Sequence, residues 1–84
     1  MLLPKAIQKL IEMMKEKSAF SGSNAELMEE FKSYSGIEIH TNVMKKMMNK
    51  NRSELEENGV TFEDSKRNNE RCIDISYDPP ADNR

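Results

Sequence analysis

Residues 41–58, TNVMKKMMNKNRSELEEN, combine side chains that can contact phosphates with side chains that can pair with base edges. If this segment is helical, its three methionines and its leucine lie along one side. The opposite side is basic and rich in amides, and no acid occurs before Glu54. This pattern is typical of a helix that enters a nucleic-acid groove, because ammonium groups bind phosphates and amides pair with bases. The candidate contacts are Asn42, Lys45, Lys46, Asn49, Lys50 and Ser53.

Two segments of alternating apolar and polar residues follow this helix, at 60–64 and 71–77, and they predict a β-hairpin. The polar residues 65–70 between them predict the connecting turn. A helix followed by a hairpin is the order of a winged helix, in which the third helix occupies the major groove and the hairpin contacts the backbone. Asn49 is the best candidate for pairing with adenine, since an amide donates and accepts at once. The expected phosphate contacts of the hairpin are Lys66, Arg67 and Arg71.

Two helices are expected to precede this unit and to position it. Pro4 suits the first turn of a helix that ends near residue 18, and its apolar residues recur at i, i+3, i+4 and i+7. Residues 19–22 are expected to break this helix as a loop, with Phe20 reaching the core from it. Ser23 and Glu26 have the spacing of a capping box at the start of the second helix.

The second helix is expected to bury one side, with Tyr34 at the end of its apolar stripe, and to stop at Gly36. The alternation at 37–40 allows a very short strand. Thr41 or Asn42 is expected to cap the third helix, which runs to about residue 57. Core packing is the expected role of the methionines on the inward stripes, namely Met14, Met28, Met44, Met47 and Met48, with Met13 near the edge of its stripe.

The fold class that these elements predict is α+β, a winged helix-turn-helix of three helices and a C-terminal hairpin. Its 84 residues make one domain at most, expected at 1–78, with a disordered tail at 79–84 that begins with two consecutive prolines. The net charge is −2, but residues 41–53 hold three lysines and one arginine without an acid, a net of +4. Residues 54–64 hold five acids and no base, a net of −5. We therefore expect a local nucleic-acid footprint, and weak, salt-sensitive binding.

Several other classes of protein lack support in the sequence. No apolar run approaches the roughly 20 residues of a membrane span, and the N-terminus lacks the apolar centre of a secretion signal. A single cysteine favours the reducing cytoplasm. No catalytic set, cofactor motif, metal-ligand cluster or small-molecule site is expected. His40 is expected at the entry to the third helix, and Cys72 on the outward side of its strand, where an inert thiol is favoured over a reactive one.

The same residues resemble a known family. The pieces FSGSNAELMEEF, IHTNVMKKMMNKNRSELEENGV and RCIDISY, within residues 20–77, resemble the winged-helix domains at the C-termini of primase/helicase-type replication proteins of phages and other mobile elements. Members often have tryptophan where this chain has Phe20, a Gly-Thr-Ala run at 21–25, and leucines where it has methionines in the third helix. The resemblance implies an accessory domain, with any motor or primase activity elsewhere in a longer polypeptide.

Other functions stay open at this point. A winged helix can instead dock on a replication protein through the acidic helix end or the hairpin, without contacting DNA. The basic side of the third helix can also be an ordinary solvated surface. An autonomous phage-type regulator would gain from dimerisation, because paired helices contact two half-sites. A small enzyme is the most distant alternative, since the catalytic set is missing.

Overall fold

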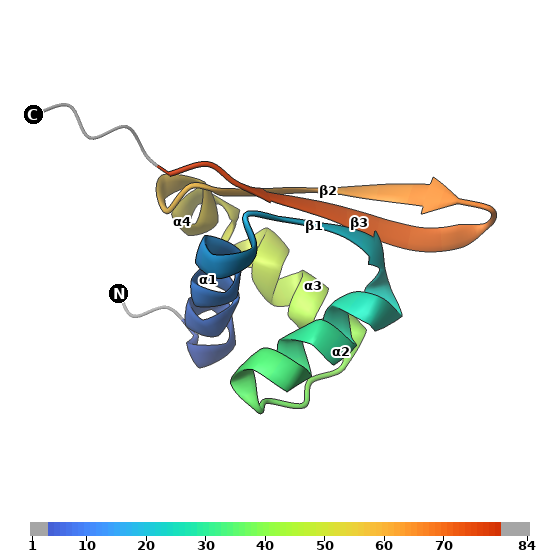
Figure 1. The fold of residues 1–84 in the computed structure, drawn as a ribbon, viewed down its shortest axis with the longest axis horizontal. Helices are drawn as coiled ribbons and strands as arrows, with labels where there is room; N and C mark the ends of the chain where they lie inside the picture. The colour runs from blue at the N-terminus through green and yellow to red at the C-terminus, as the bar shows by residue number, and fades with distance from the viewer. Residues whose placement is uncertain (1–3, 80–84) are drawn as a thin grey trace, which may run out of the picture.

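Four helices and a three-stranded antiparallel sheet make up residues 4–79, the part of the chain that the computed structural model describes (Figure 1). The sheet order is β1-β3-β2, and the helices lie on one side of the sheet. The coarse α+β class expected from the sequence is thus confirmed. The expected tail lies, from residue 80 onward, outside the described residues. The elements are α1 (Lys5–Lys17), β1 (Ala19–Ser23), α2 (Asn24–Ser35), α3 (Thr41–Lys50), α4 (Arg52–Glu57), β2 (Val60–Arg67) and β3 (Glu70–Tyr77).

The segment after α1 is a strand, which corrects the expectation of a loop at 19–22. Ser18 ends α1 with a positive φ of 71°, and its amide donates to the Met14 carbonyl. β1 then pairs antiparallel with β3, from Ala19 opposite Ser76 to Ser23 opposite Cys72. The sequence of β1, AFSGS, has a single large apolar residue, so its strand character comes from pairing with a distant segment rather than from local pattern.

The hairpin is longer than the alternating segments indicated. β2 and β3 pair along their whole length, from Val60 opposite Tyr77 to Arg67 opposite Glu70. The turn consists of Asn68 and Asn69 alone, with φ values of 52° and 64°. Positive φ at both positions is the requirement of a type I′ two-residue turn, and asparagine tolerates that conformation better than most residues. The polar residues 65–67 therefore belong to the strand and not to the expected connector.

The expected third helix is two helices, because the chain leaves helical geometry at Asn51. Its φ and ψ are −108° and 25°, and its side-chain amide donates to the Met47 carbonyl at 2.9 Å. The Met47 carbonyl also accepts the Asn51 backbone amide at 2.9 Å, and an added side-chain donor of this kind often bends a helix. α3 begins one residue after His40, whose Nδ1 accepts a hydrogen bond from the Asn42 amide at 3.2 Å. His40, and not Thr41 or Asn42, is therefore the capping residue.

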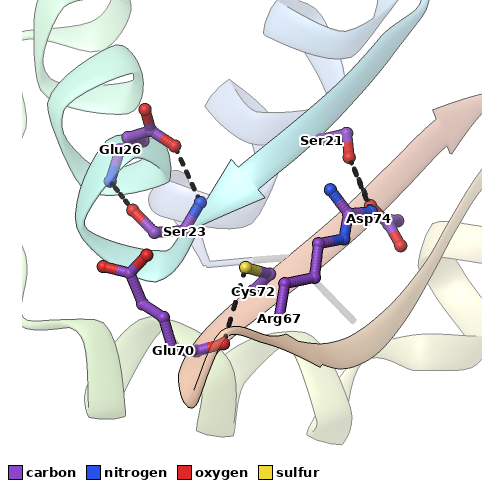
Figure 2. A network of polar contacts seen from close by, with 7 residues as sticks. All are labelled: Ser21, Ser23, Glu26, Arg67, Glu70, Cys72 and Asp74. Carbon is purple, nitrogen blue, oxygen red and sulfur yellow. Dashed lines mark hydrogen bonds and ion pairs between the residues drawn. The ribbon is translucent and has the colours of Figure 1, made fainter.

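The two ends of α2 follow the sequence-based expectation. The Ser23 hydroxyl accepts from the Glu26 amide at 3.2 Å, and the Glu26 carboxylate accepts from the Ser23 amide at 2.8 Å, so the capping box is confirmed (Figure 2). Gly36 ends the helix in the left-handed conformation, φ 76°. The following segment, 36–40, is neither helix nor strand, which corrects the short strand allowed at 37–40. Its alternation instead reflects two half-buried isoleucines that pack against the core.

The core lies between the helices and the sheet face that they cover. The apolar stripe of α1 is buried as expected, as are Met44 and Met48 of α3, and Met13 is also fully buried. Met28 and Met47 are only half-buried, and Tyr34 is exposed, contrary to its expected place on the buried side of α2. This core fixes α3 and the hairpin relative to each other. Its members are Ala6, Ile7, Leu10, Ile11, Met13, Met14, Leu27, Phe31, Met44, Met48, Leu55, Val60, Phe62, Ile73 and Ile75.

Candidate nucleic-acid interface

The outer face of α3 is basic and polar, and the buried Met44 and Met48 hold the helix down from the opposite side. Lys46 and Lys50 are exposed one helical turn apart. Within residues 4–79 neither lysine has an ion-pair partner, so both ammonium groups are available to an anionic ligand. The other predicted residues exposed on this helix and on α4 are Asn42, Asn49 and Ser53.

Lys45 does not share this outer face. Its side chain is only 19% exposed and forms an ion pair with Asp64 of β2. Lys45 therefore lies at the junction of α3 and the hairpin, where its charge is already opposed by a carboxylate. The sequence predicted that Lys45 shares one exposed face with Lys46, Asn49 and Lys50, and for Lys45 this prediction is wrong.

The amide of Asn49 is partly engaged. Its Oδ1 accepts a hydrogen bond from Arg52 Nη2 at 3.2 Å. The Arg52 guanidinium lies over the Phe62 ring, 4.1 Å from its centroid, and Nη1 donates to the Phe62 carbonyl at 3.4 Å. Bidentate pairing of Asn49 with adenine requires both its donor and its acceptor, so Arg52 must release Oδ1 first.

Arg52 was not among the candidate contacts predicted from the sequence. It is exposed next to the outer face of α3, and it joins α4 to β2 through Phe62. The i, i+3 spacing from Asn49 to Arg52 was the only local signal for this pairing. The contact with Phe62 had no such signal, because it joins separate elements.

A depression of ≈ 380 Å³ lies where α3 meets the hairpin. Lys66 and Arg71 are directly opposite each other on β2 and β3, on the sheet face that the helices cover nearer the core. Together with Lys45 they bring three cations to the depression, against the single carboxylate of Asp64. We name this depression the basic corner; its lining is Lys45, Asp64, Ser65, Lys66, Arg71 and Cys72.

Arg67 lies on the other face of the hairpin, apart from Lys66 and Arg71. Its Nη2 donates to Asp74 Oδ1 at 3.1 Å and to Ser21 Oγ at 3.2 Å, and Ser21 Oγ donates to the same Asp74 oxygen at 2.6 Å. Figure 2 shows the Arg67 side chain running beside Cys72 toward Asp74. Cys72 lies on the outward face of β3, as expected, but it is only 6% exposed, so its thiol is covered. Its Sγ donates to the Glu70 carbonyl at 3.6 Å.

The two faces of the hairpin thus differ in charge. The face that continues the helix side has Lys66 and Arg71 at its end. The uncovered face has Glu63, Glu70 and Asp74 with Arg67. A polyanion is therefore attracted to the hairpin from the side of α3 and repelled from the uncovered side of the sheet.

Comparison of the chain with protein-family models, with curated protein sequences and with solved structures gave no match. Among the helices of residues 4–79, none is both long enough and apolar enough to cross a membrane.

Proposed function

We propose that this chain is a winged helix-turn-helix module that binds nucleic acid, with DNA as the expected ligand, through α3 and the wing formed by β2 and β3. The element order supports the winged-helix assignment: α2 and α3 are joined by a short turn, and the hairpin follows. β1 is compatible with it, since it adds a short third strand beside β3. In this arrangement α3 occupies the major groove and the wing lies along the backbone.

The observation that carries this proposal is the continuity of positive charge from α3 to the wing. Lys46 and Lys50 are exposed without ion-pair partners within the described residues, and the basic corner with Lys66 and Arg71 adjoins the same helix. In this proposal the helix lysines contact phosphates beside the groove, and Asn42 and Asn49 contact base edges, Asn49 after Arg52 has released its Oδ1. The role of such a module is accessory to replication or regulation in a mobile element, as the family resemblance implies.

Fluorescence anisotropy with labelled duplex and single-stranded DNA, at two salt concentrations, tests this proposal. The Lys46→Glu/Lys50→Glu double variant is expected to abolish binding, and binding by the unmodified chain is expected to weaken steeply with salt. The matched control is Lys5→Glu/Lys15→Glu on α1, which changes the net charge equally at two exposed positions outside the interface. Equal losses of DNA affinity in both double variants would show that net charge alone causes the effect. If the unmodified chain bound neither duplex nor single-stranded DNA, the proposal would be refuted.

Docking on a replication protein is the second candidate, and an apolar surface beside α3 favours it. Val43 is 49% exposed on α3, and a depression of ≈ 420 Å³ lies next to the start of the helix. Ala25, Met28 and Ile39 supply the apolar part of its lining. If the folded chain fails to bind DNA at low salt, docking becomes the better candidate. The next comparison is then binding of a replication partner by the unmodified chain and by a Val43→Asp variant.

A further inference from the structure

The free edge of β2 presents unpaired backbone groups near the end of the hairpin. In a two-residue turn the flanking residues Arg67 and Glu70 exchange hydrogen bonds, and bonded and non-bonded pairs alternate from there. The N–H and C=O groups of Phe62, Asp64 and Lys66 therefore point away from β3. The hydrogen bond from Arg52 to the Phe62 carbonyl agrees with this alternation. Figure 1 shows this end of the hairpin projecting beyond the helices.

We propose that two copies of this chain associate by pairing their β2 edges antiparallel, with Asp64 of each copy opposite Lys66 of the other. In an antiparallel pair, a residue whose backbone groups point toward the partner strand must face another such residue. At the free edge of β2 these are the even-numbered residues, so each must face an even-numbered residue of the second copy. Centring the pair on position 64 opposes two aspartates, and centring it on position 66 opposes two lysines. Centring it on Ser65 instead places opposite charges together at both bonded pairs. Charge thus selects one register, and opposite charges across antiparallel strands stabilise their pairing.

Ser65 lies on the two-fold axis of this register. It faces Ser65 of the second copy in a non-bonded pair, where side chains approach most closely, with Cβ atoms about 4.5–5.5 Å apart. Serine is small, so the two strands can approach each other at this position.

The interface is small, and its strength follows from its parts. Asp64 and Lys66 of the two copies form four backbone hydrogen bonds in the proposed register. Asp64 keeps its contact with Lys45, since a carboxylate can accept from two cations. The register also opposes Glu63 and Arg67, but Arg67 is turned toward Asp74, so this pair is not counted. We therefore expect a weak dimer that dissociates as salt increases. This proposal does not depend on nucleic-acid binding.

Sedimentation velocity without nucleic acid, at protein concentrations from about 10 µM to about 1 mM, tests the dimer. Asp64→Lys and Lys66→Asp each oppose like charges in a homodimer, and each is expected to weaken association at least about tenfold. An equimolar mixture of the two variants restores opposite charges at both pairs and is expected to form a heterodimer. Far-ultraviolet circular dichroism verifies that each variant is folded.

Amide hydrogen exchange gives a second measurement that does not need a variant. The amides of Asp64 and Lys66 are expected to exchange more slowly at high than at low protein concentration. Those of Glu63 and Ser65 are already bonded to β3, and their exchange is expected to be independent of concentration. A chain that stays monomeric at about 1 mM would overturn the proposal. So would dimers that persist in both single variants, or a mixture that remains monomeric.

Discussion

Asp64 is expected to weaken nucleic-acid binding, because its carboxylate forms an ion pair with Lys45 at the basic corner. Replacing it by asparagine keeps the shape of the side chain and removes the charge that holds the ammonium group. Lys45 is then free to contact a phosphate, so Asp64→Asn is expected to bind DNA more tightly than the unmodified chain. The fold is expected to persist, because a pair with a half-exposed carboxylate contributes only about 0–1 kcal/mol.

The size of this effect follows from counterion release. One added phosphate contact steepens the slope of log K against log salt by about 0.9 on duplex DNA. Over a fourfold rise in salt, from about 50 to about 200 mM, this corresponds to an additional loss of affinity of about 3.5-fold. The gain from Asp64→Asn is therefore largest at low salt and shrinks as salt increases.

Anisotropy titrations at several salt concentrations measure this slope, with protein kept dilute so that it stays monomeric. The matched control is Glu63→Gln, which removes one negative charge at the neighbouring residue on the opposite face of β2 and leaves Lys45 paired. Both variants reduce general repulsion, but only Asp64→Asn is expected to steepen the slope. Equal slopes in the two variants would refute the inference that Asp64 withholds Lys45 from DNA.

Three further predictions concern stability and titration. Ser23→Ala removes the capping box and is expected to cost about 1 kcal/mol and to lower the Tm by about 4–8 °C in thermal unfolding, whereas Ser33→Ala on the exposed side of α2 is not. Met44→Ala is expected to cost about 2–5 kcal/mol in urea unfolding, because the side chain is fully buried, and Met44→Leu less than about 1.5 kcal/mol. The hydrogen bond to Glu16 raises the pKa of Tyr34 above its ordinary value of 10.0. The stability that this hydrogen bond contributes is present below pH 10.0 and is lost as pH rises through the folded-state pKa. In an ultraviolet titration, the Glu16→Gln variant is expected to show the Tyr34 pKa lowered toward 10.0.

The helices were largely predictable from the sequence. The apolar stripe of α1 and the capping box of α2 depend on residues three or four positions apart, so their pattern is local. The division of the third helix was not predicted, because Asn51 can occupy a helix interior or interrupt one according to the bond its amide makes. The two-residue turn at Asn68 and Asn69 was placed too broadly, since polar strand residues next to it resemble loop residues.

The sequence predicted which residues make up the candidate interface, but their arrangement in space could only be read from the folded structure. The sequence determined which residues are cationic and placed Lys46 and Lys50 on the side of α3 opposite the buried methionines. It could not show that Lys45 pairs with Asp64, or that Arg67 turns toward Asp74 while Lys66 and Arg71 face the helices.

By itself, the sequence determined the helical periodicities, the capping box of α2 and the sign of the charge on α3, because these depend on neighbours within one helical turn. Only the tertiary structure decided that β1 is a strand, which cations are free and how the edge of β2 is presented. The physical reason is the separation along the chain: Ala19 pairs with Ser76, and Ser21 bonds Asp74 across 53 positions. Such contacts form through packing of the whole chain, and no short-range pattern encodes them.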